Sequence, residues 1–240
     1  MRERIRRYSR LLILLALCLI GAVAGTFIVA RQPRPTTGGP VFAADAIVYG
    51  GTLETWSARA WQWTMQFPIG HNPGQDPTGA TCGARQTGQV FFLPHNLPPC
   101  TVPDNVVIFV SLVGTECSTA DAPPFYGEDA ADLRSCAVAD TDRYAVVTAQ
   151  IDGVPVANID QLRAVTPSFT LDLPSNNILG ADPGNAQAIA DGYQMMVAPL
   201  SPGEHEIVVH VELADGTVLP DKVARLTVVP ADEYRKPNDP

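Results

Sequence analysis

Residues 56–100 read WSARAWQWTMQFPIGHNPGQDPTGATCGARQTGQVFFLPHNLPPC and contain all three tryptophans of the chain. Helical spacing relates the large apolar side chains at the start of this stretch, which are Leu53, Trp56, Ala60, Trp63 and Phe67. They predict a helix that begins near Leu53, with Trp61 on a second apolar stripe. Because large aromatic side chains at helical spacing are typical of a core, we expect the indoles to anchor this helix on a sheet. The alternative interpretation is an aromatic platform that stacks on a sugar or a partner.

After this helix the sequence changes to short apolar runs and to alternation with a period of two. Strands are expected at residues 89–93, 106–112, 144–151, 154–156, 168–173, 193–200, 205–213 and 223–229. Asp152-Gly153 signals a two-residue hairpin, and Pro155 places the returning strand at a sheet edge. Many short strands behind one helix favour a mostly β fold, an antiparallel immunoglobulin-like β-sandwich with the tryptophan-rich helix packed on it.

The first thirty residues predict export from the cytoplasm. Five arginines within residues 1–10 precede an apolar segment without charge over residues 11–30. This segment is long enough for a signal-anchor transmembrane helix. Ala22-Val23-Ala24 also fits a signal-peptidase site, so a cleaved signal peptide remains open. Either way, we expect the rest of the chain to be extracytoplasmic, either secreted or anchored to the cell membrane.

Composition divides the remainder of the chain. Residues 31–40 are rich in Pro, Gly and Thr and are expected to form a stalk, residues 41–230 a β-sandwich domain, and residues 231–240 a flexible tail. Beyond Ala30 the chain has eleven basic against twenty-four acidic residues. Such a surface repels phosphate backbones and anionic headgroups. We therefore expect no nucleic-acid partner, and membrane contact only through the N-terminal segment.

Four cysteines remain once Cys18 in the apolar segment is set aside. They are Cys82, Cys100, Cys117 and Cys136. An even number in an exported domain indicates disulfides, and three connectivities are possible. We prefer Cys82–Cys100 with Cys117–Cys136, since each closes a loop of nearly twenty residues. A four-cysteine zinc site would need closely spaced pairs, and the sequence has none.

The sequence contains no complete metal-binding or cofactor-binding motif. His205 and His210 resemble a zincin pair, but they are five residues apart in an expected strand, which sends them to opposite faces. Neither a nucleophile elbow nor a phosphate-binding glycine loop occurs. Acidic residues gather in one loop at Glu128, Asp129, Asp132, Asp140 and Asp142, for which a solvated surface is favoured over calcium. We expect no metal and no cofactor.

A polar passage after the helix is the candidate ligand site. It contains His71, Asn72 and Asp76, and we expect His95 and Asn96 to lie nearby across the next strand. Long polar loops on a rigid base often carry function. Their oxygen and nitrogen atoms suit a sugar or a cation. The alternative is a loop whose residues serve only its own turns, with Asp76 capping the backbone at Thr78-Gly79.

The spacing of several residues in this region resembles that of a family of exported bacterial proteins without an assigned activity. The resemblance is carried by Trp61-x-Trp63, Pro68, Asn72-Pro73, Asp76, Thr78-Gly79, Cys82, Gln86-x-Gly88, Phe92-Leu93, Cys100 and Pro103, and later by Phe109, Cys117, residues 190–193 and residues 200–205. The family tends to have a tryptophan at the position of Phe91, and its next loop is richer in glycine. The resemblance implies export and a β-rich domain, and it transfers no catalytic residue.

Two classes of function are compatible with these features. The favoured class is an interaction or structural module without catalytic activity, displayed on the surface or secreted, with a carbohydrate or another surface protein as its partner. The alternative is a carbohydrate-active extracellular hydrolase with carboxylates at the rim of the sandwich, for which Asp76 and Glu116 are the candidates. The hydrolase requires these two carboxylates to converge.

Overall fold

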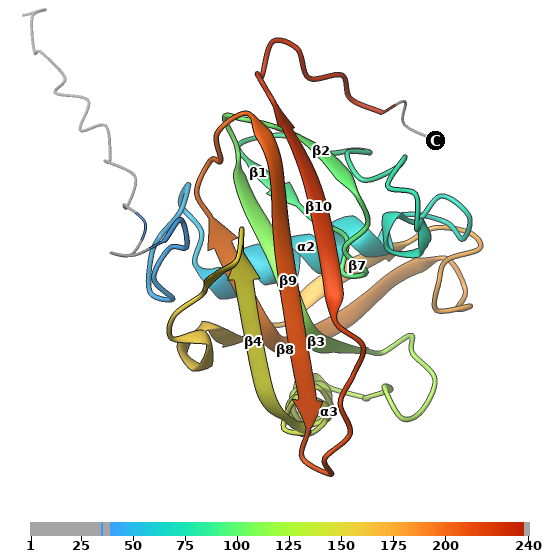
Figure 1. The fold of residues 1–240 in the computed structure, drawn as a ribbon. Helices are drawn as coiled ribbons and strands as arrows, with labels where there is room; N and C mark the ends of the chain where they lie inside the picture. Colours follow the sequence, from blue (N-terminus) through green and yellow to red (C-terminus); the bar gives the residue numbers. More distant parts are fainter. Residues whose placement is uncertain (1–34, 36–38, 238–240) are drawn as a thin grey trace, which may run out of the picture. The chain divides into compact units, whose positions relative to one another are not determined.

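Two five-stranded sheets and two α-helices make up the part of the chain that the structure describes (Figure 1). The structure is a computed structural model, and it describes residue 35 and residues 39–237. The expected signal or anchor at residues 1–30 and most of the stalk lie outside these residues. Within the described ranges, no helix has the length and apolar character needed to cross a membrane.

The first sheet is built around two long antiparallel strands, β3 and β8. Its members are β1 (Val90–Phe92), β3 (Val107–Ser118), β8 (Gly184–Val197) and β6 (Arg163–Val165) in that order, with β7 (Phe169–Leu173) also paired to β8. A β-bulge interrupts the β3–β8 ladder between Ser111 and Val113. Because a bulge adds a residue to one strand, it re-aims the side chains beside it.

The second sheet shows the predicted alternation most clearly. Its order is β2 (Cys100–Pro103), β10 (Lys222–Val229), β9 (Gly203–Leu213), β4 (Tyr144–Ile151) and β5 (Val154–Pro155). Ile207, Val209 and Val211 of β9 are buried, as their spacing predicts. Pro155 lies in the edge strand β5, again as expected. One main core cluster draws on apolar side chains from both sheets.

Two strand pairs depart from the antiparallel expectation. β1 pairs with β3 in parallel, and β2 pairs with β10 in parallel. The chain visits the second sheet at β2 before it returns to the first at β3, so β1 and β3 are not a hairpin. Parallel pairing requires such a crossover. Short-range sequence signals do not report it.

The predicted tryptophan-rich helix is α2 (Leu53–Met65), which packs on the first sheet against β3, β6, β7 and β8. Thr52 caps its N-terminus by accepting a hydrogen bond from the backbone N–H of Thr55. Trp56 and Trp63 are buried, and their indole N–H groups donate to backbone carbonyls. The core interpretation is therefore confirmed for these two tryptophans. Trp61 is half-buried and remains partly accessible.

The acidic loop expected after β3 contains the second helix, α3 (Ala130–Thr141). Asp129 caps it through the backbone N–H groups of Ala131 and Asp132. Only Leu133, Ala137 and Thr141 of the helix are buried. This narrow apolar stripe is why spacing alone did not reveal the helix, since helix recognition depends on a broad one.

Both disulfides have the connectivity preferred from the sequence. Cys82 is bonded to Cys100 with a Cα–Cα distance of 5.8 Å, and Cys117 to Cys136 with 6.2 Å. The first ties the loop after α2 to β2, and the second ties β3 to α3. Each closed loop of this size is worth about 3 kcal/mol in the chain-entropy description. Disulfides are typical of proteins in oxidising, extracytoplasmic compartments.

The residues expected as a flexible tail contact the domain over their described part. The ring of Tyr234 packs edge-on against Phe91, with 6.5 Å between ring centroids. Lys236 Nζ donates to the carbonyl of Gln86 at 2.6 Å. The segment up to residue 237 therefore covers the loop beside the first disulfide.

Candidate functional site

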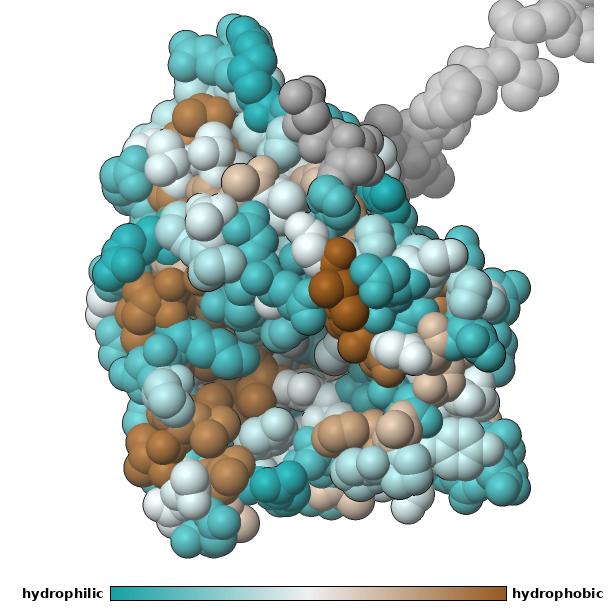
Figure 2. Space-filling model, turned by 90° about the vertical axis from the view of Figure 1, so that its right-hand side faces the viewer, coloured by the Kyte–Doolittle hydropathy of each residue, from teal (hydrophilic) through white to brown (hydrophobic). Residues whose placement is uncertain are grey.

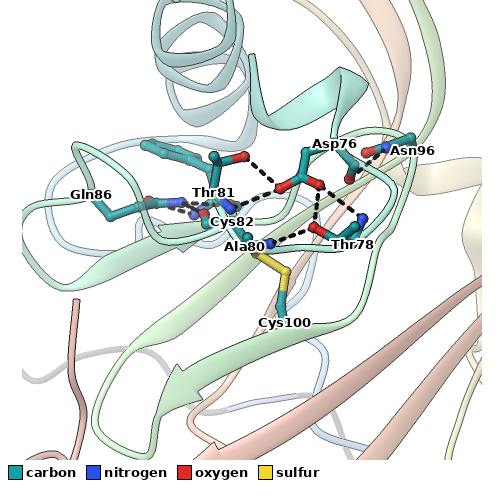
Figure 3. The surroundings of a disulfide bond; sticks show 9 residues. Asp76, Thr78, Ala80, Thr81, Cys82, Gln86, Asn96 and Cys100 are labelled. Atoms are coloured by element: carbon teal, nitrogen blue, oxygen red, sulfur yellow. Dashed lines mark hydrogen bonds between the residues drawn. A yellow bond between two sulfur atoms is a disulfide. The ribbon is translucent and has the colours of Figure 1, made fainter. Parts of the chain in front are cut away.

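The carboxylate of Asp76 organises the loop that was predicted as the ligand site (Figure 3). Its Oδ1 accepts from the backbone N–H and the hydroxyl of Thr78, at 2.8 and 2.6 Å. Its Oδ2 accepts from the backbone N–H and the hydroxyl of Thr81, both at 2.9 Å. Partial burial acts to raise the pKa of Asp76, but these hydrogen bonds outweigh it and lower the pKa to about 2. Asp76 is therefore ionised at neutral pH and structurally engaged.

The side chain of Asn72 also stabilises the loop. This side chain is buried, with Nδ2 donating to the carbonyl of Thr64 at 2.8 Å. Its Oδ1 accepts from the backbone N–H of Gly74, also at 2.8 Å, and so caps the short 3₁₀ turn η1 (Pro73–Gln75). This amide joins the loop to the last turn of α2. The turn interpretation of Asn72 and Asp76 accounts for their contacts in the structure.

His95 and Asn96 reach this loop from the other side, as the sequence predicted. The ring of His95 lies against Gly74, where an added Cβ would come within 2.5 Å of the imidazole Cε1. Asn96 Nδ2 donates to the backbone carbonyl of Asp76 at 3.4 Å. Asn72, Asp76, His95 and Asn96 are thus brought together. His71 belongs to the same loop, and its side chain is exposed.

A small cavity lies between α2 and the central β3–β8 pair, next to His95. Its volume is about 20 Å³. The lining residues are Ser57, Ala60, Trp61, Thr64, Leu93, His95, Phe109, Ser111 and Gln194. Trp61 and His95 border it as stacked rings, 6.4 Å between centroids and 22° between planes. Burial of the ring in its surroundings, and then the ammonium of Lys222, lower the pKa of His95.

Gln194 forms part of this cavity and was not predicted from the sequence. It lies on β8 directly opposite Ser111 of β3, at the β-bulge, and only 1% of it is exposed. Its Nε2 donates to Ser57 Oγ at 2.7 Å, and its Oε1 has no hydrogen-bond partner among the described residues. A glutamine within the apolar run Met195-Met196-Val197 is the sequence signal that would have identified it.

Glu116 is a buried carboxyl on β3, opposite Ala190 of β8. Burial and then the neighbouring Asp121 raise its pKa to about 8, while a hydrogen bond from Ser118 acts in the other direction. The charged neighbour of Glu116 is Asp121, to which the hydroxyl of Ser118 is hydrogen-bonded, whereas the hydrogen-bond donors to the Asp76 carboxylate are Thr78 and Thr81. The two candidate hydrolase carboxylates therefore belong to separate hydrogen-bonding groups.

We expect Glu116→Gln to be more stable than the wild type at pH 8 by at least about 1.4 kcal/mol, the equivalent of one pKa unit. The folded chain holds this proton up to about pH 8, whereas the unfolded chain releases it near pH 4.5. Wild-type stability therefore decreases as pH rises between these values. Urea unfolding at pH 4.5 and pH 8 measures the difference, with exposed Glu128→Gln as the control. Equal pH dependence in all three proteins would contradict the assignment.

The remaining acidic and histidine residues are explained by local structure. Asp140 pairs with Arg143 at 2.8 Å, and Asp142 with Arg163 at 2.7 Å. His205 pairs with Asp152, and His210 with Asp221 and Glu212, so the two histidines have different partners. Across the described residues, no group of three or more His, Cys, Asp or Glu side chains is placed to hold a metal ion.

Comparison of the sequence with models of protein families and with curated proteins gives no match. Among solved structures, the chain is similar to one described as the solution structure of amebosin, with a TM-score of 0.19 and 10% sequence identity. That match covers 60% of this chain and 97% of the other. A likeness at this level carries no argument about fold or function.

Proposed function

We propose that this chain is an extracytoplasmic interaction module that binds its ligand through two joined loops, residues 71–78 and residues 95–96. The observation that carries the proposal is the way these loops are fixed to each other. Asn96 donates to the loop that Asp76 organises, and His95 packs on Gly74. A site that is rigid before binding loses less conformational entropy on association.

The groups that this site offers are polar. His71, His95 and Asn96 have exposed side chains, while Asn72 and Asp76 hold the loop in shape. Imidazole and amide groups both donate and accept hydrogen bonds. These groups suit a carbohydrate or a polar segment of another surface protein, which are the partners we propose.

Exposed apolar side chains are spread over several parts of the described surface. On the face shown in Figure 2, apolar residues form separate patches among polar ones. Large exposed apolar side chains come from different elements, namely Ile47, Ile69, Phe125, Tyr126, Val146, Val154 and Val218. Scattered apolar residues of this kind are normal for a folded surface.

Export, display and an immunoglobulin-like form of the sandwich belong to the same proposal. The two disulfides and the arginine-flanked apolar segment at residues 1–30 support export. Two packed sheets with one shared core are compatible with an immunoglobulin-like scaffold. The resemblance to the family of exported bacterial proteins implies export and a β-rich domain.

A hydrolase is the second candidate, and it rests on Glu116. A buried carboxyl with a pKa near 8 stays protonated at neutral pH, which is the state that a general acid needs. Asp121, hydrogen-bonded by Ser118 at 2.5 Å, is the nearest candidate partner. Asp76 is a poor acid, because its pKa is about 2. Loss of glycosidase activity in Glu116→Gln, with folding intact, would favour this candidate.

We expect the purified chain to bind a neutral glycan or a surface protein in an array screen, and the double variant His71→Ala/Asn96→Ala to bind it at least about tenfold more weakly, or about 1.4 kcal/mol. Both side chains are exposed, and the Asn96–Asp76 hydrogen bond that is lost is long at 3.4 Å, so the melting temperature should change little. His210→Ala, on β9, is the matched control. Full binding by the double variant would place the site elsewhere. If the chain binds neither a glycan nor a surface protein, the proposal is overturned.

A further inference from the structure

Three buried side-chain atoms of the described residues have no hydrogen-bond partner, namely Glu116 Oε1, Tyr234 Oη and Gln194 Oε1, and of these only Gln194 lines the cavity beside His95. An unsatisfied buried acceptor costs about 1–3 kcal/mol, and native structures seldom retain one without a reason. Rotating the amide by half a turn does not remove the problem, because it exchanges an unpartnered oxygen for an unpartnered N–H. A hydroxyl group satisfies either orientation, because it both donates and accepts. The position therefore suits a single O–H group in the cavity, from a water molecule or from a ligand.

The other groups that line the cavity indicate a neutral ligand. Ser57, Thr64 and Ser111 contribute hydroxyls, and the lining includes no carboxylate. Burial and then the ammonium of Lys222 lower the pKa of His95, which disfavours the charged form of its ring. The ammonium of Lys222 is engaged by the carbonyls of His95 and Leu112, at 3.3 and 3.1 Å. An anion here would lack a free counter-charge, and a metal ion would lack anionic oxygen ligands.

The size of the cavity and the two rings beside it restrict the class of ligand further. About 20 Å³ accommodates one water-sized group, such as a single hydroxyl. The rest of the ligand must stay outside, against Trp61 and His95 and beside the loop that Asn96 joins. Trp61 is half-buried, so part of its indole is accessible beside the cavity, where it can contact the C–H groups of a sugar ring. Trp56 and Trp63 are buried and cannot do so.

We propose that this cavity is the anchoring subsite for a neutral saccharide. One sugar hydroxyl enters between Trp61 and His95 and donates to Gln194 Oε1, while the sugar ring rests against Trp61. This inference rests on the proposed binding function and names its ligand class. The hydroxyls of Ser57 and Ser111 accept or donate the second hydrogen bond of the entering group. Gln194 lies directly opposite Ser111, where the β-bulge begins and the side chains of the two strands are re-aimed.

The test is a titration of the full chain with neutral hexoses, N-acetylhexosamines and their disaccharides, followed by calorimetry and tryptophan fluorescence. Gln194→Met removes the acceptor with little change of volume, and Trp61→Ala removes the stacking face. Each is expected to weaken binding at least tenfold. Gln62→Ala is the matched control on the same helix; this side chain donates to the carbonyl of Thr170 and does not line the cavity. It is expected to bind as the wild type does.

Modified sugars make the test independent of protein folding. For the wild type, removing one particular hydroxyl from the sugar should weaken binding at least tenfold. For Gln194→Met, the same deoxy sugar and the parent sugar should bind equally. This loss of discrimination is specific to the hydroxyl that contacts Gln194, and a general structural defect would not produce it.

Two outcomes would overturn the inference and leave the proposed function standing. One is saccharide binding that the changes at Gln194 and Trp61 leave intact. The other is binding of a surface protein that depends on His71 and Asn96, without any saccharide binding up to millimolar concentration. Absence of both kinds of ligand would overturn the proposed function as well.

Discussion

Arg163→Met is expected to lower the free energy of unfolding by about 3–5 kcal/mol, because it leaves the carboxylate of Asp191 buried without its cation. Asp191 on β8 is fully buried, and Arg163 on β6 donates to both of its oxygens. The same guanidinium pairs with Asp142 at the end of α3, at 2.7 Å. Hydrogen bonding to Asp191 is the main cause that raises the pKa of Arg163. One side chain thus joins two strands and a helix.

Urea unfolding at pH 7 measures this effect, and Arg143→Met provides the matched control. Arg143 pairs with Asp140 at 2.8 Å, but 62% of its side chain is exposed. Exposed pairs contribute about 0–1 kcal/mol, so we expect the control to change little. Equal losses in the two variants would mean that the buried pair contributes no more than a surface pair.

The same ion pair is relevant to the candidate site. Asp191 and Gln194 belong to β8, three residues apart, and both lie opposite β3. A second contact from α3 reaches this part of β8, because Thr141 Oγ1 donates to the backbone carbonyl of Asp191 at 3.1 Å. Arg163 and α3 therefore help to hold the strand segment that forms the cavity floor.

Trp63→Ala is the second large effect, also expected at about 3–5 kcal/mol. The indole is 5% exposed and packs between Phe67 and Phe92, each with its ring centroid 5.9 Å away. Its N–H donates to the carbonyl of Ala84 at 2.9 Å, so truncation also leaves a buried acceptor without its donor. Denaturant unfolding at pH 7 measures the loss.

Trp61→Ala, two residues away on the same helix, is the natural comparison. Its side chain is half-buried, so we expect a clearly smaller loss of stability together with the loss of saccharide binding. Trp63→Phe should recover most of the packing. An unchanged melting temperature in Trp63→Ala would restore the interpretation of this indole as an exposed platform.

Local patterns were sufficient for most of the secondary structure. The helical spacing of five apolar residues around Trp63 predicted α2, and strict alternation predicted β9, with Ile207, Val209 and Val211 inward. Helix and strand periods depend on residues a few positions apart, which the sequence states directly. The pairing of Cys82 with Cys100 was preferred for the same kind of reason, a short polar loop between them.

Contacts between residues far apart in the sequence could not be predicted from local patterns. The parallel partners β1 and β3, and β2 and β10, are set by how the two sheets pack. The helix α3 was mistaken for a loop because only three of its residues are buried, and its stability comes from a cap, a disulfide and contacts with β3 and β8. Such contacts join residues far apart in sequence, so no local period reports them.

The candidate site likewise combines features that the sequence predicts with features that only the tertiary structure shows. The sequence alone predicted the polar loop, its neighbours His95 and Asn96, and an acidic domain with two disulfides, because composition and turn residues express these properties locally. Tertiary structure decided that Asp76 and Asn72 serve the loop itself, and that Gln194 lies below Trp61 and His95. The reason is physical: hydrogen-bond satisfaction and burial are properties of a neighbourhood in space, and the sequence separation between Ser57 and Gln194 is 137 residues.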